Sequence, residues 1–327
     1  MKSLFSVSEV NGMLSQGRRL LIAGDESLLN QITRGNWIGG TSVYFITAQG
    51  GLKSRDLLLV QEVPEYCKDI KIMQYDKQTL SNVYNDGYDN GFTIILIPRE
   101  SDVHFSHAVN VVNYPSFAFK PLVGWVTGVA LEESSDKRAK VFDGRTKTSF
   151  INKAVALHVE LPEDKIADIE VYNLLEGGKD EITFQNTNFS VSDAYINGKL
   201  TNFYEYVVNN EIDTRYPIVG KARGMITVCA FRELDQNNKT VSFYAPVFKN
   251  AVYKFAKAAK NYVENLLSNM PIEKDNILFP CICHHHYTYG KLEGRIIKEI
   301  PECPSTFGEI AHILLNQTLV CLRVYEK

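Results

Sequence analysis

Short apolar runs alternate with polar or glycine-rich segments through the first half of the chain. Runs of this length that are rich in Val, Ile, Phe and Tyr are typical of buried strands. Two of the intervening segments repeat their apolar residues at helical spacing instead. We predict strands at 19–23, 43–46, 56–61, 70–74, 92–97, 122–129 and 154–160, and helices at 77–84 and 102–112.

Helix start signals flank the first of these strands. Ser6 and Glu9 have the spacing of a capping box, so a helix over 6–16 should end at Gly17. Asp25 follows the strand and can cap a second helix. This alternation predicts a mixed α/β class. Because 327 residues exceed one average domain, we expect two closely packed α/β lobes with mixed sheets.

The second half combines hairpin signals with helical spacing. Asn197-Gly198 is a typical tight-turn dipeptide, and Asp143-Gly144 is a similar turn in the first half. We predict a helix at 202–209, paired strands at 224–231 and 240–244 around the polar turn 235–239, a long amphipathic helix at 247–267, and a strand at 277–283.

Composition narrows the class of protein. Hydrophobic residues make up 45% of the chain, and the formal net charge is −3 with both signs mixed throughout. A protein that binds the nucleic acid backbone needs a basic face, so we expect no nucleic acid partner. No segment has the length and apolarity of a signal peptide or a membrane span, so we expect a cytoplasmic protein that does not bind membranes.

Thiols and imidazoles gather near the C-terminus. Four of the six cysteines lie in the last 50 residues, which is not the spread of a disulfide framework, so we expect reduced thiols. If 279–286 is extended, Cys281, Cys283 and His285 share one face of the strand. With Cys303 or His312 as a fourth ligand, they could bind zinc. Alternatively, a cysteine nucleophile could use a histidine base.

Neither chemistry has a complete motif. The Cys-x-Cys spacing lacks the second pair of a standard zinc knuckle. Cys283 and His284 would point to opposite faces of a strand, so they could not pair directly as nucleophile and base. The interpretation we favour is a buried strand that ends in solvated histidines, with no resident metal or cofactor.

Two other segments offer polar groups to a ligand. Glu309 follows Gly308 at a predicted turn, where it could recognise an amine or cap a helix over 310–315. Asn316 and Thr318 place amide and hydroxyl groups just before the last apolar run. In the first half, the predicted turn 39–41 could expose backbone N–H groups, although it lacks a P-loop lysine and the glycine order of a dinucleotide site.

A family resemblance rests on four features, which are Tyr195-Ile196-Asn197-Gly198-Lys199 leading into 203–206, Tyr216-Pro217-Ile218, Phe279-Pro280-Cys281, and Phe307-Gly308-Glu309-Ile310 followed by Asn316-Gln317-Thr318. Together they resemble the FIST domain of F-box and intracellular signal-transduction proteins. The resemblance implies a small-ligand sensor with an N-terminal lobe at 1–194 and a C-terminal lobe at 195–327. Where that family has glycine and arginine, this chain has Cys283 and His284, so the family's ligand does not carry over.

We therefore expect a non-catalytic sensory protein that binds a small, amino-acid-like metabolite between two lobes. Binding would shift the lobes and pass a signal to a protein partner. The alternative is a cysteine-dependent or zinc-dependent enzyme that uses the cluster 281–286. The residues expected to bind the ligand are Gly39, Gly40, Thr41, Cys281, Cys283, His284, Glu309, Asn316 and Thr318.

Overall fold

The computed structural model describes residues 3–133, 136–259, 261–269, 276–284 and 302–327. Strands dominate this part of the chain and form six sheets, which include both parallel and antiparallel pairs. The mixed α/β class is thus confirmed in its broad form. The helices are short, because even the longest of those described span only nine residues.

The N-terminal segments build one sheet and cover it with a helix. α1 (Val7–Ser15) begins at Ser6, whose side chain forms the predicted capping box with Glu9. Its buried residues share a core with Trp37. Asp25 caps α2 (Glu26–Leu29), also as predicted. The strand order is β1 (Leu4–Phe5), β6 (Leu58–Glu62), β2 (Leu20–Gly24), β3 (Trp37–Thr41), β10 (Val141–Asp143) and β11 (Thr148–Phe150), with β2 and β3 parallel.

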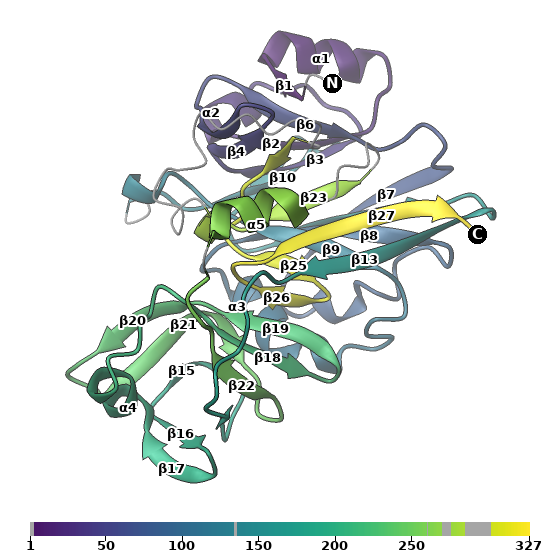
Figure 1. The fold of residues 1–327 in the computed structure, drawn as a ribbon. Coiled ribbons are helices and arrows are strands. Elements are labelled where there is room, and N and C mark those ends of the chain that lie inside the picture. Colours follow the sequence, from purple (N-terminus) through teal and green to yellow (C-terminus); the bar gives the residue numbers. More distant parts are fainter. Residues whose placement is uncertain (1–2, 134–135, 260, 270–275, 285–301) are drawn as a thin grey trace.

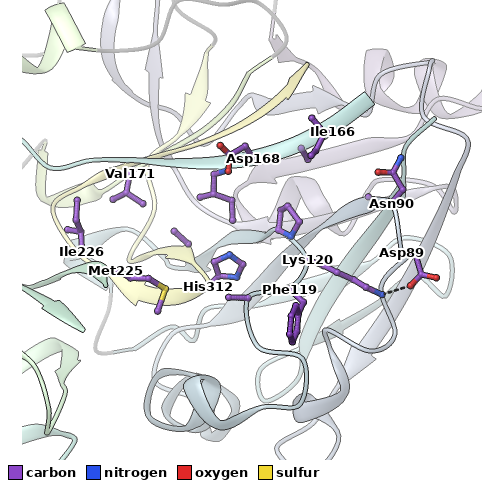
Figure 2. Close-up of a pocket in the computed structure, with 16 residues that line it drawn as sticks. Asp89, Asn90, Phe119, Lys120, Ile166, Asp168, Val171, Met225, Ile226 and His312 are labelled. Atoms are coloured by element: carbon purple, nitrogen blue, oxygen red, sulfur yellow. Dashed lines mark hydrogen bonds and ion pairs between the residues drawn. The ribbon is translucent and has the colours of Figure 1, made fainter. Parts of the chain in front are cut away.

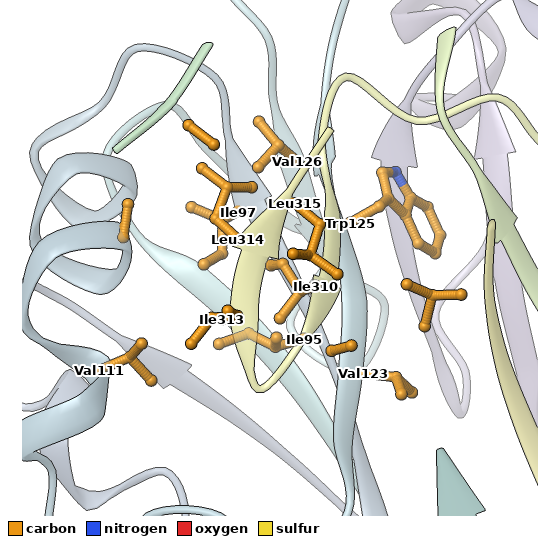
Figure 3. Close-up of a cluster of buried hydrophobic side chains, with 14 of the residues drawn as sticks. Ile95, Ile97, Val111, Val123, Trp125, Val126, Ile310, Ile313, Leu314 and Leu315 are labelled. Atoms are coloured by element: carbon orange, nitrogen blue, oxygen red, sulfur yellow. The ribbon is translucent and has the colours of Figure 1, made fainter. Parts of the chain in front are cut away.

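A second, central sheet carries most of the core. Every residue of its strand β8 (Gly91–Pro98) is buried, because the first sheet covers one face and a helix the other. Figure 3 shows apolar side chains of the central strands packed around the C-terminal hairpin. The order is β26 (Ile313–Leu315), β25 (Glu309–Ala311), β9 (Leu122–Thr127), β8, β12 (Ala154–Glu160) and β7 (Asp69–Tyr75), flanked by α3 (Asp102–Asn110), η1 (Leu80–Asn82), η2 (Val111–Asn113) and η3 (Leu131–Glu133).

The C-terminal strands return to the N-terminal half. The hairpin 309–315 completes the central sheet, and in two small sheets strands from the last 51 residues also pair with strands that precede residue 173. A division into 1–194 and 195–327 would therefore separate strands that pair with one another. The two small sheets have the orders β24 (Cys303–Pro304), β4 (Tyr44–Thr47), β5 (Gly50–Lys53) and β13 (Lys165–Tyr172), β27 (Leu319–Glu326), β23 (Ile277–Pro280), and α5 (Tyr262–Asn269) precedes β23.

Residues 182–255 alone build the remaining two sheets, which we call the middle sheets. Figure 1 shows them as the green part at the lower end of the molecule, away from both termini. The Asn197-Gly198 turn joins two of their strands, with both residues at positive φ as a tight hairpin requires. The first middle sheet has the strand order β17 (Lys199–Asn202), β16 (Asp193–Ile196), β14 (Ile182–Thr183), β22 (Val252–Phe255), β18 (Ile218–Ala222) and β19 (Met225–Cys229). The second has the order β15 (Asn188–Val191), β21 (Thr240–Val247) and β20 (Phe231–Asp235). The helix α4 (Phe203–Asn209) follows β17.

Several predicted elements are wrong, and strand pairing explains most of them. The long helix at 247–267 is absent, because β21 extends to Val247 and β22 pairs with β18, which leaves only α5 helical. The predicted helix at 310–315 is the hairpin β25–β26. The predicted turn at 39–41 is the end of the buried strand β3. The predicted helix at 77–84 is only the 3₁₀ turn η1.

Candidate functional site

Four of the expected ligand-binding residues do come together, around Glu309. This side chain is fully buried, and its Oε1 accepts hydrogen bonds from the backbone N–H and the hydroxyl of Thr318, each 2.7 Å long. Its Oε2 accepts a 3.3 Å bond from the Thr306 hydroxyl. Burial, followed by the nearby Cys281 thiol, raises the pKa of Glu309 well above its ordinary value. The carboxyl group therefore favours its neutral form.

His284 lies in the same buried cluster, with both ring nitrogens engaged. Nε2 lies 2.9 Å from the Thr318 carbonyl oxygen, and Nδ1 lies 2.7 Å from the Tyr262 hydroxyl. Because a carbonyl only accepts, Nε2 carries the proton and Nδ1 accepts from the tyrosine. Neither nitrogen is left to take a proton from a thiol, so His284 acts as a bridge between α5 and the start of β27.

The cysteines are not arranged as the sequence predicted. The strand β23 ends at Pro280, and Ile282–His284 is helical, so Cys281 and Cys283 do not share the face of a strand. Cys281 is fully buried, and burial raises the pKa of its thiol well above the ordinary value. Across the residues placed by the structure, no three His, Cys, Asp or Glu side chains are positioned to hold a metal ion. His285 and His286 lie outside the described residues.

The remaining expected residues have structural contacts. Gly40 lies against the central sheet, since a Cβ built on it would be 2.4 Å from the Thr127 methyl group. Gly39 packs less closely, since a Cβ built on it would be 3.0 Å from the Trp37 ring. The Thr41 hydroxyl accepts a 3.0 Å bond from the Lys140 backbone N–H.

Asn316 accepts a 3.4 Å bond from the backbone N–H of Ala230, and its own N–H donates to the Val228 carbonyl at 3.1 Å. It therefore joins the central sheet to the middle sheets. Of these residues, Thr41 lines a pocket of about 290 Å³ beside α2, whereas Gly39, Gly40 and Asn316 line none of the described pockets. Asn316 does not hydrogen-bond to Glu309 in the described chain.

A cavity of about 530 Å³ lies elsewhere, where the central sheet, β13 and the middle sheets meet. Figure 2 shows β13 along one side of it, with His312, Lys120 and Phe119 opposite. Its volume suits a small ligand, and its walls combine apolar side chains with a few polar groups. The lining residues are Asp89, Asn90, Gly91, Ala118, Phe119, Lys120, Pro121, Ile166, Ala167, Asp168, Ile169, Val171, Met225, Ile226, Ala311 and His312.

His312 supplies the most distinctive polar group of this cavity. It sits at the tip of the hairpin β25–β26 with a φ of 62°, a left-handed conformation that is uncommon for residues other than glycine. Its Nδ1 lies 3.1 Å from the Tyr84 hydroxyl, whereas Nε2 has no hydrogen-bond partner among the described residues. Burial lowers the pKa of His312 to about 4, so a neutral imidazole lines the cavity at pH 7.

Charged groups of both signs complete the lining. Lys120 Nζ donates to the Gly87 carbonyl at 2.9 Å and to the exposed carboxylate of Asp89 at 3.1 Å. Asp168 accepts a 2.8 Å bond from the backbone N–H of Ile169. The sequence offered no local motif for this site, because its residues come from five separated segments. The sequence pattern indicates His312 only as a candidate fourth ligand for zinc.

Comparison with known proteins gives a family without a function. A protein-family model that describes a family of unknown function matches residues 5–325. No curated protein matches the sequence. Within the described part of the chain, no helix has the length and apolarity required to cross a membrane.

Proposed function

We propose, for a chain that belongs to the family of unknown function DUF6976, a non-catalytic sensory role in the cytoplasm. The protein binds a small ligand in the cavity lined by His312, Lys120 and Asp168. This proposal has the sensory role that the resemblance to the FIST domain implies. Its ligand site is the cavity and not the cluster around Glu309. The middle sheets form one lobe and the rest of the described chain forms the other.

The observation that carries this proposal is the position of the cavity. Its walls come from both proposed lobes, since Met225 and Ile226 belong to the middle sheets and the other lining residues do not. A ligand there would contact both lobes at once. It would therefore favour whichever lobe orientation gives the best contacts, and a protein partner could read that change.

The chemistry of the lining supports an amino-acid-like ligand. The Lys120 ammonium group can bind a carboxylate, and the Asp168 carboxylate can bind an amine. His312 Nε2 can donate to a carboxylate in the tautomer whose Nδ1 accepts from Tyr84. Met225 and Ile226 offer apolar surface to a side chain. By contrast, the burial of Cys281 and the engagement of both nitrogens of His284 do not favour thiol catalysis.

A thermal-shift screen of amino acids and related metabolites tests the proposal. Met225→Trp should fill part of the cavity, and Leu200→Trp is the matched control, because Leu200 is an exposed residue of β17 that does not line it. We expect a compound that stabilises wild type and Leu200→Trp by about 2.7 kcal/mol at roughly 100 times its Kd, and leaves Met225→Trp unchanged. Equal stabilisation of all three proteins would overturn the proposal, and no stabilisation by any compound in the screen would rule out the amino-acid-like ligand.

A further inference from the structure

The cavity runs along an unpaired strand edge. β13 forms the outside of its three-stranded sheet, where it pairs with β27 on one side only. In the part of the chain that the structure describes, no strand pairs with its other side. That other side borders the cavity, because five residues of β13 line it.

The backbone N–H and C=O groups of every second residue of β13 point toward the cavity. The Lys327 N–H donates to the Asp164 carbonyl at 2.8 Å, which sets the ladder so that even-numbered residues of β13 face β27. The Ile169 N–H agrees with this pattern, because it bonds the Asp168 side chain rather than β27. The N–H and C=O groups of Ala167, Ile169 and Val171 therefore point outward, and all three residues line the cavity.

A second unpaired edge meets one end of the cavity. β19 is the outermost strand of its sheet, and its Val228 carbonyl accepts a bond from the Asn316 N–H, so Val228 faces away from β18. By the period of two along a strand, Ile226 faces the same way. Ile226 also lines the cavity.

The shape of the cavity fits an extended occupant. Figure 2 shows it extending beside β13 from Val171 and Ile226 at one end to Asn90 at the other. The outward-facing residues 167–171 span about 13 Å at the rise of an antiparallel strand. A peptide of about four residues would pair with these outward backbone groups once the Asp168 carboxylate leaves the Ile169 N–H, and every second side chain would meet the cavity wall.

We propose that the ligand of this cavity is a short extended peptide, bound by strand addition to β13 with apolar side chains against Met225 and Phe119. This inference rests on the proposed function, because it names the ligand class for the same cavity. Asp168 protects the strand edge, because its carboxylate accepts the hydrogen bond of the Ile169 N–H until a peptide carbonyl replaces it as the acceptor. Such side-chain protection is one way in which proteins keep free edges from pairing at random.

The test uses a pool of N-acetylated tetrapeptide amides with apolar residues at alternate positions. In ¹⁵N-labelled wild type, the amide signals of Ala167, Ile169 and Val171 should shift and gain protection from hydrogen exchange. The same pool with methylated backbone nitrogens should not bind, because it keeps the side chains and loses the donors. No binding by the unmethylated pool, or equal binding by the methylated pool, would overturn the inference.

Two variants of β13 test the register. Ile169→Pro removes an N–H that the ladder with β27 does not use, so the fold should persist and peptide affinity should fall about tenfold, whereas Ile169→Val should bind as wild type. Asp168→Ala should raise affinity severalfold by freeing that N–H. If Ile169→Pro does not fold, the methylated pool alone decides.

If metabolites bind in the Met225-dependent way while peptides do not, the cavity function stands and only the peptide class fails. If neither class of compound binds, both proposals fail.

Discussion

Thr318 donates two hydrogen bonds to the same oxygen of Glu309, one from its backbone N–H and one from its hydroxyl, each 2.7 Å long. The carbonyl of Thr318 in turn accepts bonds from His284 Nε2 at 2.9 Å and from the Cys281 N–H at 3.2 Å. A single residue at the start of β27 thus connects the central sheet, β23 and, through His284, α5. The residues that looked like a ligand wall hold the C-terminal strands together.

This arrangement predicts that Glu309 matters for stability and not for ligand binding. Glu309→Ala removes the acceptor for both Thr318 donors and leaves a buried gap, so the free energy of unfolding should fall by about 2–5 kcal/mol. Glu309→Gln keeps an acceptor oxygen and should stay within about 1 kcal/mol of wild type at about pH 4, where the wild-type carboxyl group is neutral. Urea unfolding measures both. Any compound found in the screen should still stabilise Glu309→Gln, and loss of that stabilisation would return Glu309 to the ligand site.

The raised pKa of Glu309 adds a pH dependence of known sign. Because its pKa is higher in the folded state than in the unfolded state, the contribution is complete below the ordinary value of 4.5 and is lost as pH rises through the folded pKa. Glu309→Gln cannot ionise, so its stability should gain on wild type as pH rises above the ordinary pKa of 4.5. Parallel pH curves for the two proteins would contradict the buried neutral carboxyl.

Close packing at Gly40 predicts a pair of coupled substitutions. A Cβ at this position would lie 2.4 Å from the Thr127 methyl group, so Gly40→Ala should destabilise the protein by about 1–3 kcal/mol. Thr127→Ser deletes that methyl group, and the Thr127 hydroxyl has no hydrogen-bond partner in the described chain. The double variant should recover at least half of the loss in a double-mutant cycle. Simple additivity would mean that the two residues do not clash.

The convergence around Glu309 was partly predictable, because its members lie within 40 residues of one another at the ends of apolar runs. What the sequence could not convey is that these residues face the interior. The run 310–315 looked helical behind an acidic residue, yet pairing with β9 and a left-handed His312 fold it into a hairpin. Local propensity gave way to tertiary pairing there.

The cavity was harder to predict from the sequence than the cluster around Glu309. Its lining depends on which backbone groups of β13 face outward, and the register of this strand follows from partners in β27 that lie between 147 (Tyr172↔Leu319) and 161 (Lys165↔Glu326) residues away in the sequence. The strands themselves were predicted best where both faces are buried. The segments 92–97 and 154–160 are apolar apart from Thr93, His158 and Glu160, and they correspond closely to β8 and β12.

His107 should make the protein sensitive to acid. It is buried on α3, neither ring nitrogen has a hydrogen-bond partner among the described residues, and burial lowers its pKa to about 3. Because the folded pKa is depressed, its contribution is complete above the ordinary value of 6.5 and is lost as pH falls toward 3. His107→Leu should be within about 1 kcal/mol of wild type at about pH 8 and more stable at about pH 5.

Denaturation curves at the two pH values decide this prediction. The slope of stability against pH should fall by up to about 1.4 kcal/mol per pH unit in His107→Leu, the value for one titrating proton. The other buried histidines, including the adjacent His104, should keep the rest of the slope. An unchanged slope would mean that His107 already carries its proton in the folded state.

Thiol labelling distinguishes the proposed sensory role from the alternative, a cysteine-dependent enzyme. Of the six cysteines, five are buried and Cys283 is partly exposed. An alkylating reagent should therefore modify about one thiol per native chain, at Cys283, and all six after denaturation. Cys283→Ser should abolish the fast reaction, as judged by peptide mass spectrometry. If Cys281 reacts as quickly as Cys283, it is neither buried nor held as a neutral thiol, and the cluster around Thr318 would again be a candidate for nucleophilic chemistry.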